Sequence, residues 1–277
     1  MQSNPTFVDV NDSQLAYFSY GAGETIVFVH GAVSDHRFWL PQLQRFAGDY
    51  RCIGLDQRYF GHSRDQSSRP YSLSTHASDL SAFVDTLGLG SVHVVATSYG
   101  AGVALASASA RPDRFASLFL NEPILASLVT EPASLVQLSA ARKDLAAVAA
   151  ALAVGDEERA VELFCDWTAF PGAFETLPPE LKAVFHENAA TVRLLFAAPA
   201  PTITAADLGT LKMPVTFTTG EKTKPFFHIQ TMAAHRSVEH SSLLAIAQAH
   251  HAPSFECVDA FNRAVIEHLN GAAATAA

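Results

Sequence analysis

The chain has 277 residues, and its 18 Lys and Arg against 27 Asp and Glu give a formal charge of −9 with histidine neutral. This length allows one large α/β domain or two small ones, and the shortage of cations argues against a protein whose main role is to bind a nucleic-acid backbone. Hydrophobic residues make up 49% of the chain, which excludes intrinsic disorder and is enough to bury a large core and line an apolar cavity.

The first half of the chain alternates strand-like and helix-like segments. Short runs rich in β-branched and aromatic residues predict strands over residues 14–20, 25–29, 51–56, 92–96 and 115–120. Between the third and fourth of these runs, residues 72–87 place Leu73, Leu80 and Phe83 on one helical face, and Gly88 is a helix stop. Strands separated by helices of this length predict a parallel, doubly wound sheet.

The second half begins with a change of pattern. Residues 124–209 contain alanine-rich helical stretches joined at prolines and no convincing pair of strands. Strand character returns over residues 214–220 and 242–247, and a closing helix is predicted over 257–269. We therefore expect a core formed by residues 1–123 and 210–277, interrupted by a helical insertion over 124–209 that covers the strand ends.

A serine between small residues follows the strand predicted over 92–96. The pattern Ala96-Thr97-Ser98-Tyr99-Gly100 has the form small-x-Ser-x-Gly, in which a strand turns sharply into a helix. Side chains larger than that of Ala would collide with the backbone at positions 96 and 100 of so tight a turn. The turn directs the Ser98 hydroxyl out of the sheet and places the Tyr99 N–H where it can donate to an oxyanion. Ser98 is thus the predicted nucleophile.

Two histidines, His250 and His251, follow the last predicted strand. A serine nucleophile needs a base that titrates near neutral pH, and histidine is the side chain with such a pKa. From the residues alone, either histidine fits this role.

The chain resembles the α/β-hydrolase superfamily over almost its whole length. The motifs that carry the resemblance occur in the family's order, namely His30-Gly31, Asp56 to Ser63, Ser98 in its turn, Pro214 to Gly220 and the loop with His250 and His251. The resemblance implies an α/β fold with an eight-stranded, mostly parallel sheet flanked by helices, and a helical cap formed by the insertion. It also implies that His251, which precedes Ala252-Pro253, is the base, and that the Ala32 N–H is a second oxyanion donor beside that of Tyr99.

The acidic member of the triad departs from the usual pattern. Many family members carry an Asp three residues after the glycine that ends the penultimate strand, but here Gly220 is followed by Thr223 at that position. Threonine cannot carry the charge that stabilises an imidazolium. Some members take the acid from the end of the preceding strand, which points to Glu122. Glu221, beside the usual loop position, is the alternative.

The resemblance implies a serine hydrolase that cleaves a carboxylic ester or lactone through an acyl-enzyme. Aromatic residues cluster in the insertion and after the strand over 214–220, so Trp167, Phe170 and Phe226 are predicted to contact a small, largely apolar substrate. Carbon–carbon bond hydrolases, cofactor-free oxygenases and haloperoxidases use the same Ser/His pair and stay open, as does a non-catalytic ligand receptor. Haloalkane dehalogenases carry Asp at the position of Ser98 and are disfavoured.

The remaining features predict no cofactor and no metal. The three cysteines, Cys52, Cys165 and Cys257, form no CxxC pair. We expect Arg58 and five of the other histidines to face solvent, namely His36, His76, His186, His235 and His240. A secretory signal and a membrane-spanning run are not recognised, so we expect a cytoplasmic protein that acts on a small molecule, without nucleic-acid or membrane partners. The sequence gives no indication of the oligomeric state.

Overall fold

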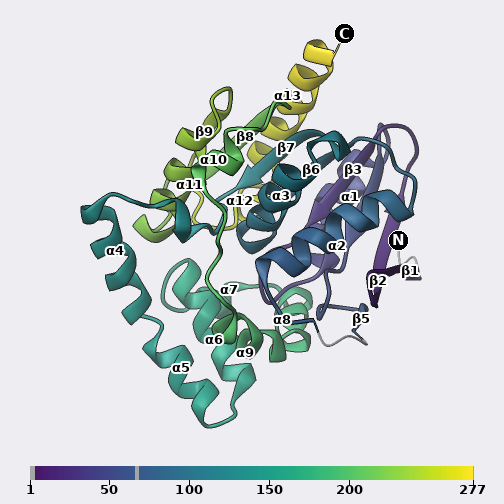
Figure 1. The fold of residues 1–277 in the computed structure, drawn as a ribbon. Helices are drawn as coiled ribbons and strands as arrows, with labels where there is room; N and C mark the ends of the chain where they lie inside the picture. The colour runs from purple at the N-terminus through teal and green to yellow at the C-terminus, as the bar shows by residue number, and fades with distance from the viewer. Residues whose placement is uncertain (1–3, 66–68, 277) are drawn as a thin grey trace.

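A single mostly parallel sheet forms the centre of the computed structural model, which describes residues 4–65 and 69–276 (Figure 1). Eight strands follow one another in the order β1-β2-β4-β3-β6-β7-β8-β9, and the two-residue strand β5 pairs with β2. Pairs made by β1 and β2 are antiparallel, and those from β4 to β9 are parallel. The predicted eight-stranded, mostly parallel sheet is confirmed. Residues 1–3, 66–68 and 277 of the predicted core lie outside the described residues. The strands are β1 Thr6–Val10, β2 Ser13–Tyr20, β3 Thr25–Val29, β4 Arg51–Leu55, β5 Arg64–Asp65, β6 Val92–Thr97, β7 Phe115–Asn121, β8 Val215–Gly220 and β9 Ser242–Ile246.

Helices cover both faces of the sheet. Alternate residues of β3 belong to different buried clusters, because successive side chains of a strand point to opposite faces. Val27 and Val29 pack in the cluster that includes α2 (Leu73–Thr86), α3 (Ser98–Ala110) and α11 (Pro225–Ser237). Ile26 and Phe28 pack with α1 (Leu40–Phe46) and α13 (Val258–Ala276). Burial on both sides explains why the central strands are continuous apolar runs.

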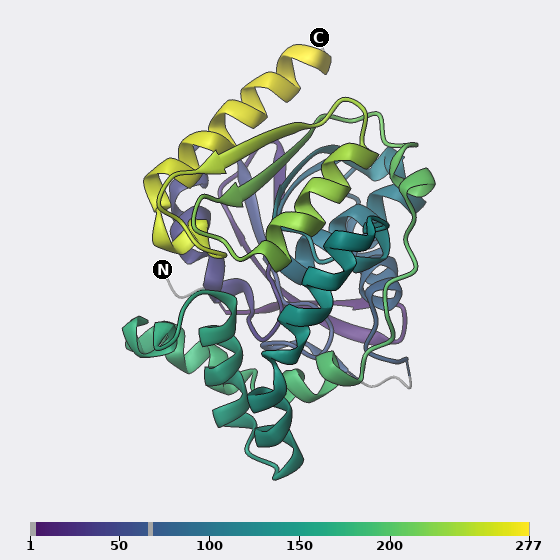
Figure 2. The same ribbon diagram turned by 90° about the vertical axis from the view of Figure 1, so that its left-hand side faces the viewer.

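The chain between β7 and β8 is helical. Residues 122–214, all of which the structure describes, contain no strand, in keeping with the helices expected over 124–209. Figures 1 and 2 show the middle of this segment gathered at one side of the sheet. The helices of this segment pack in two buried clusters: those between residues 146 and 197 in one that also includes Val33, from the loop after β3, and the first and last in the cluster of Val27 and Val29. We call them the inserted helices: α4 Pro132–Lys143, α5 Ala146–Ala153, α6 Glu157–Thr168, α7 Ala173–Thr176, α8 Pro179–Glu187, α9 Ala190–Ala197 and α10 Ala205–Leu208.

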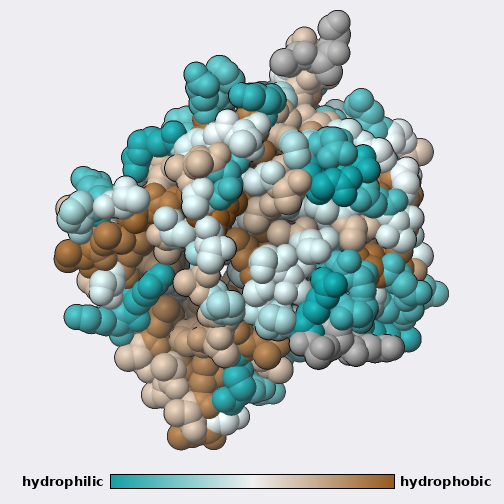
Figure 3. Space-filling view, viewed as in Figure 1, coloured by the Kyte–Doolittle hydropathy of each residue, from teal (hydrophilic) through white to brown (hydrophobic). Residues whose placement is uncertain are grey.

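Hydrophobic residues surround a hollow in the face shown in Figure 3, between α4 and the helices below it. Two apolar side chains on the outer side of α4, Leu135 and Val136, are exposed. Within the described part of the chain, no helix has the length and apolar character that crossing a bilayer would require.

The structure adds elements that the sequence pattern did not indicate. Strand β1 has the sequence TFVDV and only two fully buried residues, so its hydrophobic alternation is short. It is stabilised by its antiparallel pairing with β2 rather than by burial of both faces. Helix α13 continues to Ala276, seven residues past the predicted end at Leu269.

Candidate active site

Ser98 lies at the sharp turn between β6 and α3. Its φ of 56° is in the left-handed region, which non-glycine residues adopt rarely and which is found at functional sites. A Cβ added to Gly100 would come within 2.2 Å of the His30 carbonyl oxygen. Ala96, two residues before the serine, is fully buried. The structure therefore has the tight strand–turn–helix geometry that the small residues at 96 and 100 predicted.

His251 is held from the end of β7 by two neighbouring residues. Its Nδ1 lies 2.5 Å from Oε2 of Glu122, and the Asn121 side-chain amide donates to its carbonyl oxygen at 2.9 Å. The ring stacks on Phe227 with 3.7 Å between ring centroids. With Nδ1 directed to Glu122, Nε2 is the nitrogen left to accept a proton. His251 and Ser98 both line a small cavity of about 80 Å³.

Glu122 is fully buried and has a φ of 44°. Besides His251, three donors reach its carboxylate at 2.9 Å each: the Thr219 hydroxyl, the Gly220 N–H and the Thr223 hydroxyl. A buried carboxylate requires such partners, because its transfer from water is otherwise very unfavourable. Thr223 occupies the position where the resemblance places an Asp, and here it supports the carboxylate that reaches the histidine instead.

The structure does not bring the two alternative residues into this arrangement. Glu221 is exposed, and its Oε2 accepts from the Gln248 N–H at 2.8 Å. The Nδ1 of His250 lies 2.9 Å from Oε2 of a different carboxylate, Glu256. Glu122 and His251 are thus the acid–histidine pair beside Ser98.

His30 fixes the backbone that carries the Ala32 N–H. Its ring is fully buried, and desolvation lowers its pKa, which favours the neutral form. Nε2 accepts from the Gln57 N–H at 3.1 Å, so Nδ1 carries the proton and donates to the Gly31 carbonyl at 2.7 Å. Because the peptide is planar, fixing this carbonyl also fixes the direction of the Ala32 N–H. Ala32 and Tyr99 line the same cavity as Ser98.

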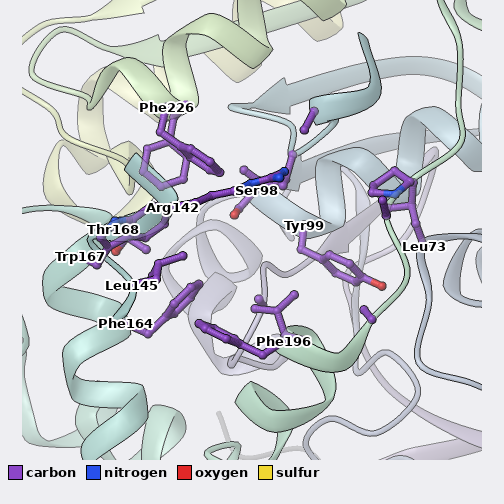
Figure 4. A pocket seen from close by; sticks show the side chains of 18 of the residues that line it. Leu73, Ser98, Tyr99, Arg142, Leu145, Phe164, Trp167, Thr168, Phe196 and Phe226 are labelled. Carbon is purple, nitrogen blue, oxygen red and sulfur yellow. The ribbon is translucent and has the colours of Figure 1, made fainter. Parts of the chain in front are cut away.

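A cavity of about 780 Å³ opens beside Ser98 (Figure 4). Of the predicted substrate contacts, Trp167 and Phe226 line it. Phe170 does not: it lines another cavity, of about 350 Å³, where its ring lies 5.0 Å from that of His250. Its place in the insertion did not indicate which cavity it faces. Aromatic residues at the Ser98 cavity that the sequence analysis did not assign to substrate are Tyr99, Phe164, Phe196 and Phe227.

Several polar side chains expected at the surface are buried, so those predictions are wrong. Arg58 is fully buried and forms a two-point ion pair with Asp79, at 2.7 and 2.9 Å. His76 is buried, and its Nδ1 lies 2.6 Å from the Tyr99 hydroxyl. In each case a partner far away in sequence satisfies the buried group, and spacing within one motif could not reveal it.

One group of described residues has metal-ligand character. The side-chain ligand atoms of His36, Asp56 and His62 lie within 4.8 Å of one another, and His36 is buried rather than exposed as predicted. Both oxygens of Asp56 already face a backbone N–H and an imidazole Nδ1. Burial opposes ionisation of Asp56, but these hydrogen bonds outweigh it and hold its pKa well below the usual range. The group is thus satisfied as a carboxylate between two histidines.

Three comparisons with known proteins extend these observations beyond the geometry. A family model described as the alpha/beta hydrolase fold matches residues 24–256, which is most of the chain. The chain is an α/β hydrolase. The resemblance inferred from the motifs is confirmed, together with the fold that it implied.

Curated relatives of this α/β hydrolase have several different activities. The chain is 34% identical over 119 residues to the dihydrolipoyllysine-residue acetyltransferase component of an acetoin cleaving system from Cupriavidus necator. It is 32% identical over 118 residues to a haloalkane dehalogenase from Agrobacterium fabrum, and 33% over 107 residues to the lipase LipV from Mycobacterium tuberculosis. The matches cover 43%, 42% and 36% of this chain, and 32%, 38% and 38% of those proteins. The chain thus spans about a third of the length of the curated relatives it matches.

Solved structures of other α/β hydrolases superpose over nearly the full chain. An esterase from Thermogutta terrifontis has a TM-score of 0.77 at 21% identity, covering 98% of this chain and 99% of its own. The enol-lactonase from Burkholderia xenovorans LB400 gives 0.75 at 19%, with 96% and 100% covered. A bromoperoxidase from Bacillus anthracis gives 0.80 at 20%, again with 96% and 100%. At these identities the likeness shows a shared fold.

Proposed function

We propose that this α/β hydrolase cleaves a carboxylic ester or lactone of a small, largely apolar substrate through an acyl-enzyme on Ser98. The observation that carries the proposal is the buried Glu122–His251 pair, 2.5 Å apart, beside a serine in a left-handed turn. A histidine oriented by a carboxylate, next to a serine hydroxyl that lines a cavity, is the arrangement that activates a serine nucleophile.

In the first half of the reaction, Nε2 of His251 removes the Ser98 hydroxyl proton while Oγ attacks the substrate carbonyl carbon. The carbonyl oxygen becomes an oxyanion, which accepts hydrogen bonds from the Ala32 and Tyr99 N–H groups. Glu122 keeps the His251 proton on Nδ1 and stabilises the imidazolium that forms. His251 then gives its proton to the leaving alkoxide, and the acyl group stays on Ser98.

In the second half, water replaces the leaving group. His251 takes a proton from the water, whose oxygen attacks the acyl carbon, and the same oxyanion contacts form again. The Ser98–acyl bond breaks, His251 returns the proton to Ser98, and the carboxylic acid leaves. A lactone follows the same steps, except that the leaving alcohol remains part of the released hydroxy acid.

The inserted helices act in this proposal as the cap that encloses the substrate. Trp167 on α6 and Phe226 on α11 both line the 780 Å³ cavity, and their rings contact each other with 4.9 Å between the centroids. An apolar wall of this size suits an acyl or aryl group of modest length, since such pockets bury most of a ligand's surface.

Ester hydrolysis by the Ser98→Ala variant tests the proposal. With p-nitrophenyl butyrate and a γ-lactone as substrates, we expect kcat to fall by at least about 10⁴-fold, because no nucleophile remains. Ser109→Ala makes the same substitution on α3, where the hydroxyl only bonds the Leu105 carbonyl, and should leave turnover unchanged. Full activity in Ser98→Ala would exclude the acyl-enzyme.

The same assay separates the other activities that use a Ser/His pair. Turnover of a vinylogous diketone but of no ester would indicate carbon–carbon cleavage, and halide oxidation without ester turnover would indicate a haloperoxidase. Absence of turnover, together with an intact Ser98 after treatment with an organophosphonate, would favour a non-catalytic receptor.

A further inference from the structure

In the described part of the chain, the large cavity beside Ser98 is lined by positively charged side chains without negatively charged ones. Among the described residues that line it, Arg142 and Lys143 are the charged ones, and no Asp or Glu is present. Both cations lie at the end of α4 and are exposed, so they stand at the mouth of an otherwise apolar space. In Figure 4 the Arg142 side chain extends into the cavity toward Ser98.

The other cations of the inserted helices have carboxylate partners. Arg159 pairs with Glu162 at 2.8 Å, Arg193 with Glu157 at 2.9 Å, and Lys182 with Glu175 at 2.9 Å. Over residues 4–65 and 69–276, no carboxylate lies within 4.0 Å of the charged nitrogen atoms of Arg142 or Lys143. The two cations that line the cavity are thus the ones that a ligand can neutralise.

An anionic ligand would need local positive charge in order to bind to this protein. The chain carries a formal charge of −9, so its overall field repels anions. A guanidinium presents two parallel N–H donors that match the two oxygens of a carboxylate, and a partly apolar surrounding strengthens that contact relative to bulk water. Lys143, next to it, adds a second positive charge at the same mouth.

The positions of the cavities indicate which part of the substrate carries the charge. His251, which would protonate the leaving alcohol, lines the 80 Å³ cavity together with Phe38 and Ala252. Arg142 lines the larger cavity together with Tyr99, and the acyl group would lie in this cavity. Arg142 and Lys143 line only the larger cavity and His251 only the smaller one, so a leaving group placed at His251 would lie apart from the cations.

We propose that the acyl part of the substrate bears a second, free carboxylate, which Arg142 binds with help from Lys143. This inference rests on the proposed ester or lactone hydrolysis and names its substrate class: monoesters or lactones of dicarboxylic acids whose chain is otherwise apolar.

Two esters of matched length test the inference. Mono-(4-nitrophenyl) glutarate carries the free carboxylate, and 4-nitrophenyl pentanoate replaces it with a methyl group. We expect kcat/KM of the wild type to favour the glutarate ester, and the ratio of the two values to fall at least tenfold in Arg142→Gln. Arg142→Lys should recover part of the ratio, and Lys143→Gln should lower it by a smaller factor. Arg159→Gln, which removes a cation of the same charge from α6, should leave the ratio unchanged.

Binding to Ser98→Ala decides the inference independently of turnover. The glutarate ester should bind this variant more tightly than the pentanoate ester by calorimetry, and adding Arg142→Gln should remove the difference. If the wild type hydrolyses neither ester, the proposed function fails, while the binding difference still supports the carboxylate site. Equal binding of both esters, or a difference that survives Arg142→Gln, would overturn the inference even where ester hydrolysis is found.

Discussion

Glu122 combines two features that rarely occur together, full burial and a positive φ. Its backbone turns out of β7 directly after Asn121, and its carboxylate crosses to the neighbouring strand, where Thr219 and Gly220 donate to it. The extra methylene of Glu relative to Asp suits this reach from one strand end to the next. Strain at residue 122 persists because four hydrogen-bonding partners hold the side chain in place.

Removing the charge of Glu122 should therefore lower turnover without unfolding the site. In Glu122→Gln we expect kcat to fall on the order of 10³–10⁴-fold, since a neutral partner favours the wrong histidine tautomer and does not stabilise an imidazolium. Steady-state kinetics on p-nitrophenyl butyrate, with circular dichroism to check the fold, measure this. Glu221→Gln is the matched control, and a larger loss in that variant would assign the acid to the other carboxylate.

Thr223 makes a second residue-scale prediction possible. Its hydroxyl lies 2.9 Å from the Glu122 oxygen that contacts His251, so a carboxylate at position 223 would lie close to the same ring. In a Glu122→Gln background, Thr223→Asp should raise kcat at least tenfold, because the negative charge is restored from the loop after β8. Thr223→Asn in that background has the same shape without the charge and should give no recovery. Equal rates for the two double variants would contradict the prediction.

At the scale of elements, the turn between β6 and α3 depends on how closely the helix approaches β3. Helix propensity alone predicts that Gly100→Ala stabilises the protein by about 1 kcal/mol. Sterics predict the opposite, because the new Cβ would lie 2.2 Å from the His30 carbonyl and 2.7 Å from that of Val29. These are backbone atoms at the end of the central strand β3, and moving them would disturb the sheet.

We expect the steric effect to dominate, with a net loss of about 2 kcal/mol in the free energy of unfolding. Thermal and urea unfolding of Gly100→Ala measure this loss, and kcat should fall as well because His30 and Ser98 both shift. Gly48→Ala provides the control, since nothing lies within 4 Å of a Cβ there. A melting temperature for Gly100→Ala at or above that of the unchanged protein would show that the approach is looser than described.

The elements that the sequence could predict are those whose signal is local. Strand β3 reads Thr-Ile-Val-Phe-Val and is buried at every residue, so its apolar run is unambiguous. The α2 helix shows its buried face at helical spacing and its Ser72 cap. Strand β1 was not predicted, because it is stabilised by pairing with β2, and a local sequence pattern does not show such pairing.

The residues of the candidate site also fall into those that the sequence could predict and those that it could not. Ser98 was predicted from its turn motif, whereas His251 and Glu122 were predicted from the family resemblance; in the structure His251 contacts Glu122 and lines a cavity with Ser98. The positions of Arg58 and Phe170 were not, because each depends on a contact made across the fold: an ion pair with Asp79 for the first, and a separate cavity beside His250 for the second. Sequence spacing fixes which residues share a turn, whereas packing between distant elements decides which way a side chain faces.

At the scale of the whole molecule, the inserted helices and the sheet share structure near the site. Val33 follows Ala32 in the loop after β3, has a φ of 54° and packs in the buried cluster of α5, α6 and α9. The backbone that presents the Ala32 N–H is therefore anchored at one end by His30 in the core and at the other by the inserted helices. In the proposed mechanism, the groups that enclose the substrate and those that bind the oxyanion thus belong to one continuous packed unit.

A buried histidine network joins the far side of the sheet to the last helix. His268 on α13 contacts Thr216 of β8 through Nδ1 at 2.8 Å and Ser117 of β7 through Nε2 at 2.9 Å. Ser117 also contacts Nδ1 of His93 on β6 at 2.7 Å. Desolvation, together with the neighbouring His93, lowers the pKa of His268 to about 4. The network ties three strands and α13 together, and the lowered pKa keeps His268 neutral at pH values where an ordinary histidine is protonated.

This arrangement predicts a specific loss of stability in acid. The unfolded chain protonates residue 268 near the ordinary histidine pKa of about 6.5, and the folded chain only near 4, so the unfolded state binds more protons in between and stability falls as pH drops through that window. At a pH low enough for both states to be protonated, the shift lowers the free energy of unfolding by roughly 3 kcal/mol.

In His268→Gln, which cannot titrate, the free energy of unfolding from urea titrations should depend less on pH between 6.5 and 4 than in the unchanged protein. His240→Gln removes an exposed histidine and should leave the slope as it is. Equal slopes for the His268 variant and the unchanged protein would mean that the acid sensitivity arises from other groups, such as His93 and His30, whose pKa values burial also lowers.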